Sequence, residues 1–246
     1  MSDPPPPPRA IPAQERLIVA LDVPEAGDAR ALVERIGPAA CFYKVGMELA
    51  MAPGFFAFIA WLREQGKRVF VDLKFFDIPQ TVAHAVARLA THDVQLCTVH
   101  GNESMMRAAG EAKSGALRVL AVTALTSLDQ GDLDDLGFAC DVESLVLSRA
   151  RRALAAGCDG VVSSGLEAAR LRQSAPRELI VVTPGIRPVA NRPVADQKRV
   201  MTPRQAIAAG ADYLVVGRPI RSAADPRAAA LAIQAEIAAA TAGVEP

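Results

Sequence analysis

The chain has 246 residues, of which 51% are hydrophobic and 22% are charged, and its 27 basic and 27 acidic side chains give a net charge of zero. This balance excludes a disordered chain and leaves no overall field that would attract nucleic acid or an anionic membrane. The length suits one large domain, because α/β barrels often reach this size without dividing. We therefore predict a single domain, with any anion-binding site formed locally.

The N-terminal segment is rich in proline, with an unbroken run from Pro4 to Pro8. No basic region followed by an apolar stretch marks it as a secretory signal, and no run of about eighteen apolar residues occurs anywhere in the chain. The sequence predicts a flexible tail over residues 1–14, a folded domain over residues 15–246, no membrane association and a cytoplasmic location.

The four cysteines are widely separated and form neither a CxxC motif nor a zinc-binding pattern with histidine. We expect them to be reduced thiols packed as small apolar groups. The sequence predicts no metal site and no organic cofactor.

Short β-branched runs alternate with longer segments of helical periodicity, a pattern typical of repeated βα units around a parallel sheet. Thr202-Pro203 and Asp225-Pro226 each combine a capping side chain with a proline suited to the first turn of a helix. The expected strands cover residues 16–22, 41–47, 67–75, 95–100, 117–125, 159–164, 179–184 and 212–217. Eight such units predict a closed (β/α)8 TIM barrel. An open doubly wound sheet is the alternative, but the first strand lacks the GxGxxG turn of a dinucleotide site.

The segment from Phe70 to Thr81 carries the strongest chemical signal, because charged residues end an apolar strand. Residues two apart on a strand face the same side, so Asp72 and Lys74 should lie side by side. Asp77 then falls on the loop before Ile78-Pro79, where functional residues are common. In a βα barrel the active site lies at the carboxyl ends of the strands. We therefore place these charges in the active site.

A second group of residues suggests that the ligand carries a phosphate. Loops after the seventh and eighth strands of such barrels commonly bind phosphate through backbone N–H groups and a bidentate arginine. Here those loops contain Thr183-Pro184-Gly185-Ile186-Arg187, a basic segment up to Arg199, and Gly217-Arg218. We predict that Arg218 and the backbone at Gly217 bind the phosphate of the substrate.

These motifs together resemble the bacterial type of the orotidine 5′-phosphate decarboxylase family, over nearly the whole chain beyond the tail. The resemblance rests on Asp22, Tyr43-Lys44-Val45-Gly46, the block from Asp72 to Thr81, Leu125-Thr126-Ser127, Thr183 to Arg187, Asp196-Gln197-Lys198-Arg199 and Gly217-Arg218-Pro219-Ile220. It implies cofactor-independent conversion of orotidine 5′-phosphate to UMP in pyrimidine biosynthesis.

The resemblance also implies roles for individual residues. Lys74 is similar to the proton donor, with Lys44, Asp72 and Asp77 as its charged companions. Asp77 and Thr81 would complete the site of the partner subunit in a homodimer. The other implied substrate contacts are Asp22 to the ribose, Thr126 and Ser127 to the base, Gln197 to base and phosphate, and Arg187, Gly217 and Arg218. His100 is left out of the catalytic set, because Gly101-Asn102-Glu103-Ser104 follows it where the family often has a small residue and a glycine pair.

Each of these residues also has a purely structural interpretation. Asp72 and Lys74 alone could form an ordinary ion pair, Asp22 could form a turn before Pro24, and Arg187 could be a solvated loop charge. Two other functions remain open. A related sugar-phosphate enzyme, such as a keto-gulonate phosphate decarboxylase or a hexulose phosphate synthase, would need magnesium, and a catalytically idle barrel would bind nucleotides as a sensor.

Overall fold

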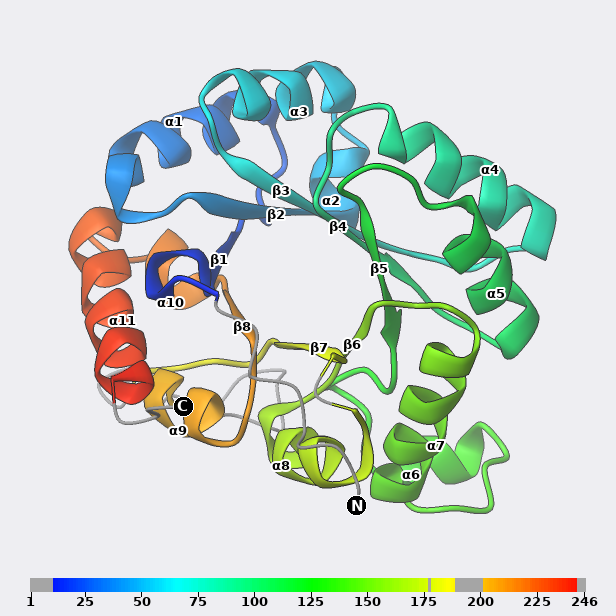
Figure 1. The fold of residues 1–246 in the computed structure, drawn as a ribbon. Helices are drawn as coiled ribbons and strands as arrows, with labels where there is room; N and C mark the ends of the chain where they lie inside the picture. The colour runs from blue at the N-terminus through cyan, green and yellow to red at the C-terminus, as the bar shows by residue number, and fades with distance from the viewer. Residues whose placement is uncertain (1–10, 177, 189–200, 243–246) are drawn as a thin grey trace, which may run out of the picture.

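Eight parallel strands close into a barrel in chain order, with β8 paired to β1, in the computed structural model, which describes residues 11–176, 178–188 and 201–242. The strands are β1 Leu17–Ala20, β2 Phe42–Gly46, β3 Arg68–Phe75, β4 Leu96–Val99, β5 Arg118–Val122, β6 Gly160–Val162, β7 Ile180–Thr183 and β8 Tyr213–Val216. Figure 1 shows the helices arranged around the outside of this ring in the same order. The predicted single (β/α)8 barrel is confirmed.

The helices begin where the sequence carries capping signals. The Thr202 hydroxyl accepts a hydrogen bond from the Gln205 N–H and the Asp225 carboxylate accepts one from the Ala228 N–H, so both predicted starts are confirmed. In the described residues the α-helices are α1 Ala26–Ile36, α2 Met47–Ala50, α3 Phe55–Glu64, α4 Pro79–Ala90, α5 Glu103–Ala112, α6 Gln130–Asp135, α7 Val142–Ala155, α8 Gly165–Ser174, α9 Pro203–Ala208, α10 Arg218–Arg221 and α11 Pro226–Thr241, and the 3-10 helices are η1 Ala13–Glu15 and η2 Gly37–Ala39.

The element boundaries differ from those expected in two respects. The strands are shorter at their ends than predicted, and Met47, expected in a strand, begins α2. Part of the segment assigned to the tail also packs on the barrel, since the Gln14 carbonyl accepts hydrogen bonds from Cys41 Sγ and from Gln234 Nε2, and Ile11 packs inside the barrel. Ordered chain therefore precedes residue 15, while residues 1–10 lie outside the described part.

The strands separate two apolar cores. Side chains such as Ile18, Phe42 and Phe70 point into the barrel and fill its interior, whereas Val19 and Tyr43 point outward and pack in the layer beneath the helices. Burial on both faces explains why the strands are nearly continuous apolar runs. A polar side chain inside the barrel consequently stands out against its surroundings.

A repeated contact holds the amino-terminal end of the barrel. The side chains of Gln95, Asp159 and Asp212, each just before a strand, accept hydrogen bonds at 2.8 to 2.9 Å from the backbone N–H groups of Val69, Val119 and Val181 on the neighbouring strands. Basic side chains contact the same acceptors: Arg63 at Gln95, Lys113 at Asp159 and Arg172 at Asp212. Polar residues at this end thus serve strand pairing.

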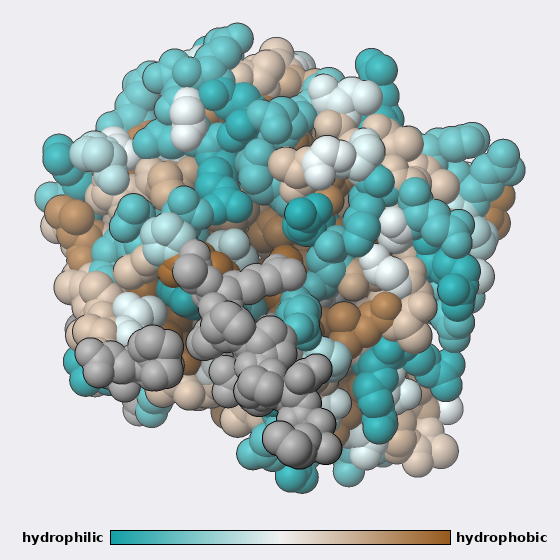
Figure 2. Space-filling model, viewed as in Figure 1, coloured by the Kyte–Doolittle hydropathy of each residue, from teal (hydrophilic) through white to brown (hydrophobic). Residues whose placement is uncertain are grey.

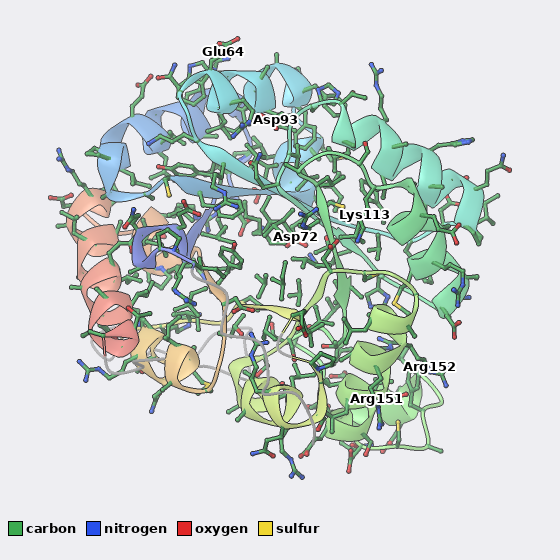
Figure 3. The ribbon with its side chains drawn as sticks, in the orientation of Figure 1. Glu64, Asp72, Asp93, Lys113, Arg151 and Arg152 are labelled. Carbon is green, nitrogen blue, oxygen red and sulfur yellow. The ribbon has the colours of Figure 1, made fainter. Side chains whose placement is uncertain are left out.

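Hydrophilic residues cover much of the periphery of the face in Figure 2. Arg151 and Arg152 on α7 are exposed at the edge of the molecule, as expected for a solvated helix face (Figure 3). All four cysteines are free, and burial raises the pKa of the Cys158 thiol to about 12. None of the helices in the described ranges combines the length and apolarity needed to cross a bilayer.

Candidate active site

A cavity of about 450 Å³ opens at the carboxyl ends of the strands. Its volume lies in the range of small-molecule sites. The charged residues that line it are Asp22, Lys44, Glu48, Asp72, Lys74, Arg187, Arg218 and Arg221. The active-site end predicted from the sequence therefore carries a charged cavity.

Four of these side chains form a row of alternating charge. Lys44 Nζ lies 2.7 Å from Asp22 Oδ1 and 3.6 Å from Asp72 Oδ2. Lys74 Nζ lies 2.9 Å from Asp72 Oδ1. Each inner member has opposite charges on both sides, so the ion pairs compensate for the burial of Lys44 and Asp72.

The row follows from the register of the first three strands. Ala20 pairs with Lys44, and Gly46 pairs with Asp72, so the charged residues leave neighbouring strands at similar heights. Ala20 and Phe70 point into the barrel, and period-two alternation then places Asp22 and Asp72 on the same inner side. Figure 3 shows Asp72 within the ring of strands.

The end of β3 is irregular. Val71 pairs with Cys97 but Phe75 pairs with Val99, so β3 advances four residues while β4 advances two. Within this bulge Lys74 has φ of 50°, in the left-handed region that costs a side-chain-bearing residue roughly 1–2 kcal/mol. Bulges often re-aim a side chain beside an active site. Here the bulge directs the Lys74 side chain toward Asp72, so that the ammonium contacts the Asp72 carboxylate.

Electrostatics keep Asp72 ionised. Burial alone would raise the pKa of this carboxyl, but Lys44, Lys74 and hydrogen bonds from Lys74 and Thr98 together hold the pKa below its ordinary value. An ionised Asp72 in turn stabilises both ammonium groups beside it.

The remainder of the cavity is rich in arginine. Arg187 follows β7, and Arg218 and Arg221 belong to α10 after β8. Among the described lining residues, five cations outnumber three anions, so the local field favours an anion although the chain has no net charge. This composition would suit an anionic group such as the phosphate predicted for the ligand.

The structure brings most, but not all, of the predicted site residues together. Besides the charged row, Thr126, Arg187, Gly217 and Arg218 line the cavity. Ser127 is exposed and does not line it. Gln197 lies outside the described residues.

Asp77 and Thr81 lie apart from the cavity of their own chain. Both are exposed, and Asp77 Oδ1 accepts a hydrogen bond from the N–H of Ile78 at 2.6 Å. Within a single subunit, Asp77 is therefore not part of the charged row. Asp22 instead supplies the second carboxylate of the row, through its contact with Lys44.

Sequence reasoning missed several residues at the site. Glu48 and Arg221 line the cavity, but each lies in a short helix that no motif identified. Thr98 is completely buried on β4 and hydrogen-bonds to Asp72. Threonine is common in strands, so its identity alone does not indicate a site residue. Only the inward-facing position of Thr98 on β4 could have identified it. Across the described ranges, no group of three His, Cys, Asp or Glu side chains is arranged to hold a metal ion.

The fold and the cavity define a (β/α)8-barrel protein with a charged cavity, rich in cations, at the carboxyl ends of its strands. The family model of the orotidine 5′-phosphate decarboxylase / HUMPS family matches residues 15–233. The chain belongs to this family.

Relatives match over nearly their whole length. The chain is 62% identical over 229 residues to orotidine 5′-phosphate decarboxylase of Methylococcus capsulatus, covering 93% of this chain and 94% of the relative. It is 52% identical over 235 residues to the enzyme of the same name from Xanthomonas oryzae pv. oryzae, covering 95% and 96%. The crystal structure of orotidine 5′-phosphate decarboxylase from Lactobacillus acidophilus matches with a TM-score of 0.80 at 35% identity, covering 91% of this chain and 99% of that one.

Proposed function

We propose that this protein removes CO2 from orotidine 5′-phosphate to form UMP, the last step of pyrimidine nucleotide synthesis. The observation that supports this reaction best is the Lys74–Asp72 pair, with 2.9 Å between Nζ and Oδ1, inside a cavity that also contains three arginines. The arginines suit a phosphate, and the pair suits a reaction that develops negative charge and then needs a proton.

Lys74 is the proposed acid. Breaking the bond between C6 and the carboxylate carbon releases CO2 and leaves the electron pair on C6, in the plane of the pyrimidine ring. The ring π system cannot delocalise this pair, so a fixed ammonium must stabilise it. Lys74 then gives its proton to C6 and becomes a neutral amine, which solvent protonates again.

Asp72 has two proposed effects. It orients the Lys74 ammonium, and its charge repels the substrate carboxylate that becomes CO2. Two like charges 4 Å apart interact by about 4 kcal/mol at an effective dielectric near 20. Repulsion of this size supplies only part of the acceleration, so stabilisation by Lys74 must supply more.

The remaining contacts are assigned by resemblance to the family. Arg187, Gly217 and Arg218 hold the phosphate and adjoining groups, Asp22 binds the ribose, and Thr126, Ser127 and Gln197 contact the base. Thr126, Arg187, Gly217 and Arg218 line the same cavity as Lys74, which supports this assignment. Binding energy from the phosphate would help to orient the distant reacting carbon.

The proposed active form is a homodimer in which Asp77 and Thr81 complete the partner's site. Both side chains are exposed outside their own cavity. Phe76 and Ile78, which flank Asp77 between β3 and α4, are each more than 60% exposed, as is Met47, the first residue of α2 after the adjacent strand β2. Apolar side chains gathered in this way are typical of an interface. We also place the reaction in the cytoplasm, where the free state of the four cysteines would persist.

The test follows the absorbance of orotidine 5′-phosphate with purified protein treated with EDTA, and product analysis identifies UMP. Turnover without added metal supports the proposal. Activity on a sugar phosphate that requires magnesium would instead support the related-enzyme alternative. Tight UMP binding without CO2 release would support a nucleotide sensor.

A further inference from the structure

Thr98 lies immediately behind the charged row and does not line the cavity. Its side chain is completely buried on β4, at 0% exposure. Its hydroxyl donates to Asp72 Oδ1 at 2.9 Å and accepts from the backbone N–H of Lys74 at 2.9 Å. One hydroxyl thus contacts both residues of the pair that carries the proposed chemistry.

These contacts close a ring of hydrogen bonds. The Lys74 N–H donates to Thr98, Thr98 donates to Asp72, and the Lys74 ammonium donates to the same Asp72 oxygen at 2.9 Å. Backbone and side chain of Lys74 are therefore tied to one carboxylate oxygen. A hydroxyl that donates and accepts at once is needed for this ring.

The ring lies at the bulge in β3. The regular register between β3 and β4 is interrupted from Val71 to Phe75, and the Thr98 hydroxyl accepts the bond from the Lys74 N–H there. The left-handed backbone of Lys74 is a strained state that persists only when the surroundings hold it. Thr98 supplies such a restraint from the neighbouring strand.

We propose that Thr98 is a positioning residue, which holds the Lys74 backbone in its left-handed state and aims the Asp72 carboxylate at the Lys74 ammonium. This inference rests on the proposed function, since its kinetic consequence is a slower proton transfer to the substrate. Thr98 itself touches no substrate.

The central variant is Thr98→Val, which keeps the shape of the side chain and removes the hydroxyl. We expect kcat to fall by about 10- to 100-fold, the range for a misplacement near 1 Å, while KM changes by less than about threefold. Thr98→Ser retains the hydroxyl and should restore kcat to within about threefold of the wild type.

Thr123→Val is the matched control. Thr123 is also completely buried, directly after β5, and its hydroxyl donates to the Val162 carbonyl at 3.0 Å. The side chain of Thr123 does not itself line the cavity. Thr123→Val also loses a buried hydroxyl and its hydrogen bond, and it should stay folded and keep its kcat. If Thr98 had a purely structural role, the two variants would have equal kcat values. That result would overturn the inference.

Two further readouts separate this inference from the proposed function. If wild-type protein does not decarboxylate orotidine 5′-phosphate, the proposed function fails, and the crystal structure of Thr98→Val still tests positioning. The expected structure has Lys74 out of the left-handed region or Asp72 turned from the ammonium, and an unchanged pair contradicts the inference. Should Thr98→Val not fold, Thr98→Ala takes its place. Failure of both to fold would assign Thr98 to the fold alone and also overturn the proposal.

Discussion

Asp22 Oδ1 lies 2.7 Å from Lys44 Nζ, and both atoms lie directly beside the backbone of Gly46. A Cβ atom added at Gly46 would lie 3.0 Å from Lys44 Nζ and 3.2 Å from Asp22 Oδ1. The absence of a side chain at Gly46 therefore leaves room for the first ion pair of the charged row.

Gly46→Ala should displace this pair and lower kcat/KM by about 10- to 100-fold, because Lys44 also contacts Asp72. Steady-state kinetics on orotidine 5′-phosphate measure the change. Gly27→Ala is the control, since a Cβ there meets nothing within 4 Å. Equal kinetics in the two alanine variants would show that Gly46 does not protect the pair.

Lys74→Ala should abolish turnover, with kcat lower by at least about 1,000-fold, since it removes both the stabilising charge and the proton donor. The protein should stay folded because Asp72 keeps its contacts with Lys44 and Thr98. Kinetics and circular dichroism measure both results. Lys113→Ala, which removes an ion pair at the opposite end of the barrel, should retain kcat. Near-normal activity of Lys74→Ala would exclude Lys74 as the acid.

The shared site can be tested by mixing inactive chains. If Asp77 acts in the partner's site, a dimer of one Lys74→Ala chain and one Asp77→Ala chain contains one site with both residues intact. Mixing should therefore restore up to about one quarter of the wild-type activity per chain, with half of the dimers mixed and one of two sites intact in each. Mass spectrometry of differently tagged chains verifies subunit exchange. No recovery after proven exchange would contradict the arrangement.

Asp159 should contribute to stability and not to catalysis. Asp159→Ala removes the acceptor of the Val119 N–H and the partner of Lys113, so we expect a loss of about 1–3 kcal/mol in the free energy of unfolding. Urea denaturation measures this loss. The kcat of the folded variant should match that of the wild type, and a large fall in kcat would show that the two ends of the barrel are coupled.

His100 should make stability depend on pH below its ordinary pKa of 6.5. Burial lowers its pKa in the folded state, and Arg149 and Lys74 lower it further. As the pH falls below 6.5, the unfolded chain therefore binds a proton more readily than the folded protein, and stability is lost until the pH passes the folded pKa. Urea denaturation at pH 7.5 and 5.5 should show a smaller loss for His100→Asn than for the wild type, and equal losses would contradict this effect. The lowered pKa of Asp72 has a separate effect: it should reduce stability as the pH falls below the ordinary value of 3.8.

The barrel could be predicted because each strand is apolar on both faces and each is followed by a helical segment. Alternation along β3 also predicted that Asp72 faces the active-site side together with Lys74. Strand boundaries were less accurate, since an apolar run continues past the last paired residue, as at Leu21 after β1. Hydrogen bonding between strands, which no single segment encodes, decides where pairing stops.

The finer geometry of the site could not be predicted for similar reasons. Alternation predicted that Asp72 and Lys74 share a face, but their 2.9 Å contact arises in a bulge that depends on β4. Thr98 is encoded 24 residues beyond Lys74 and has the identity of an ordinary strand residue. The contact of Asp22 with Lys44 was not predicted, because it joins residues on two different strands.

The backbone at Lys74 adopts a left-handed conformation, which glycine adopts at a lower energetic cost than any residue with a side chain. Selection for heat resistance alone would favour removing that lysine, while selection for the proposed reaction would retain it. The residue proposed to donate the proton therefore also lowers the stability of the fold. Replacing it should be the simplest way to a more stable variant, and that variant would be inactive.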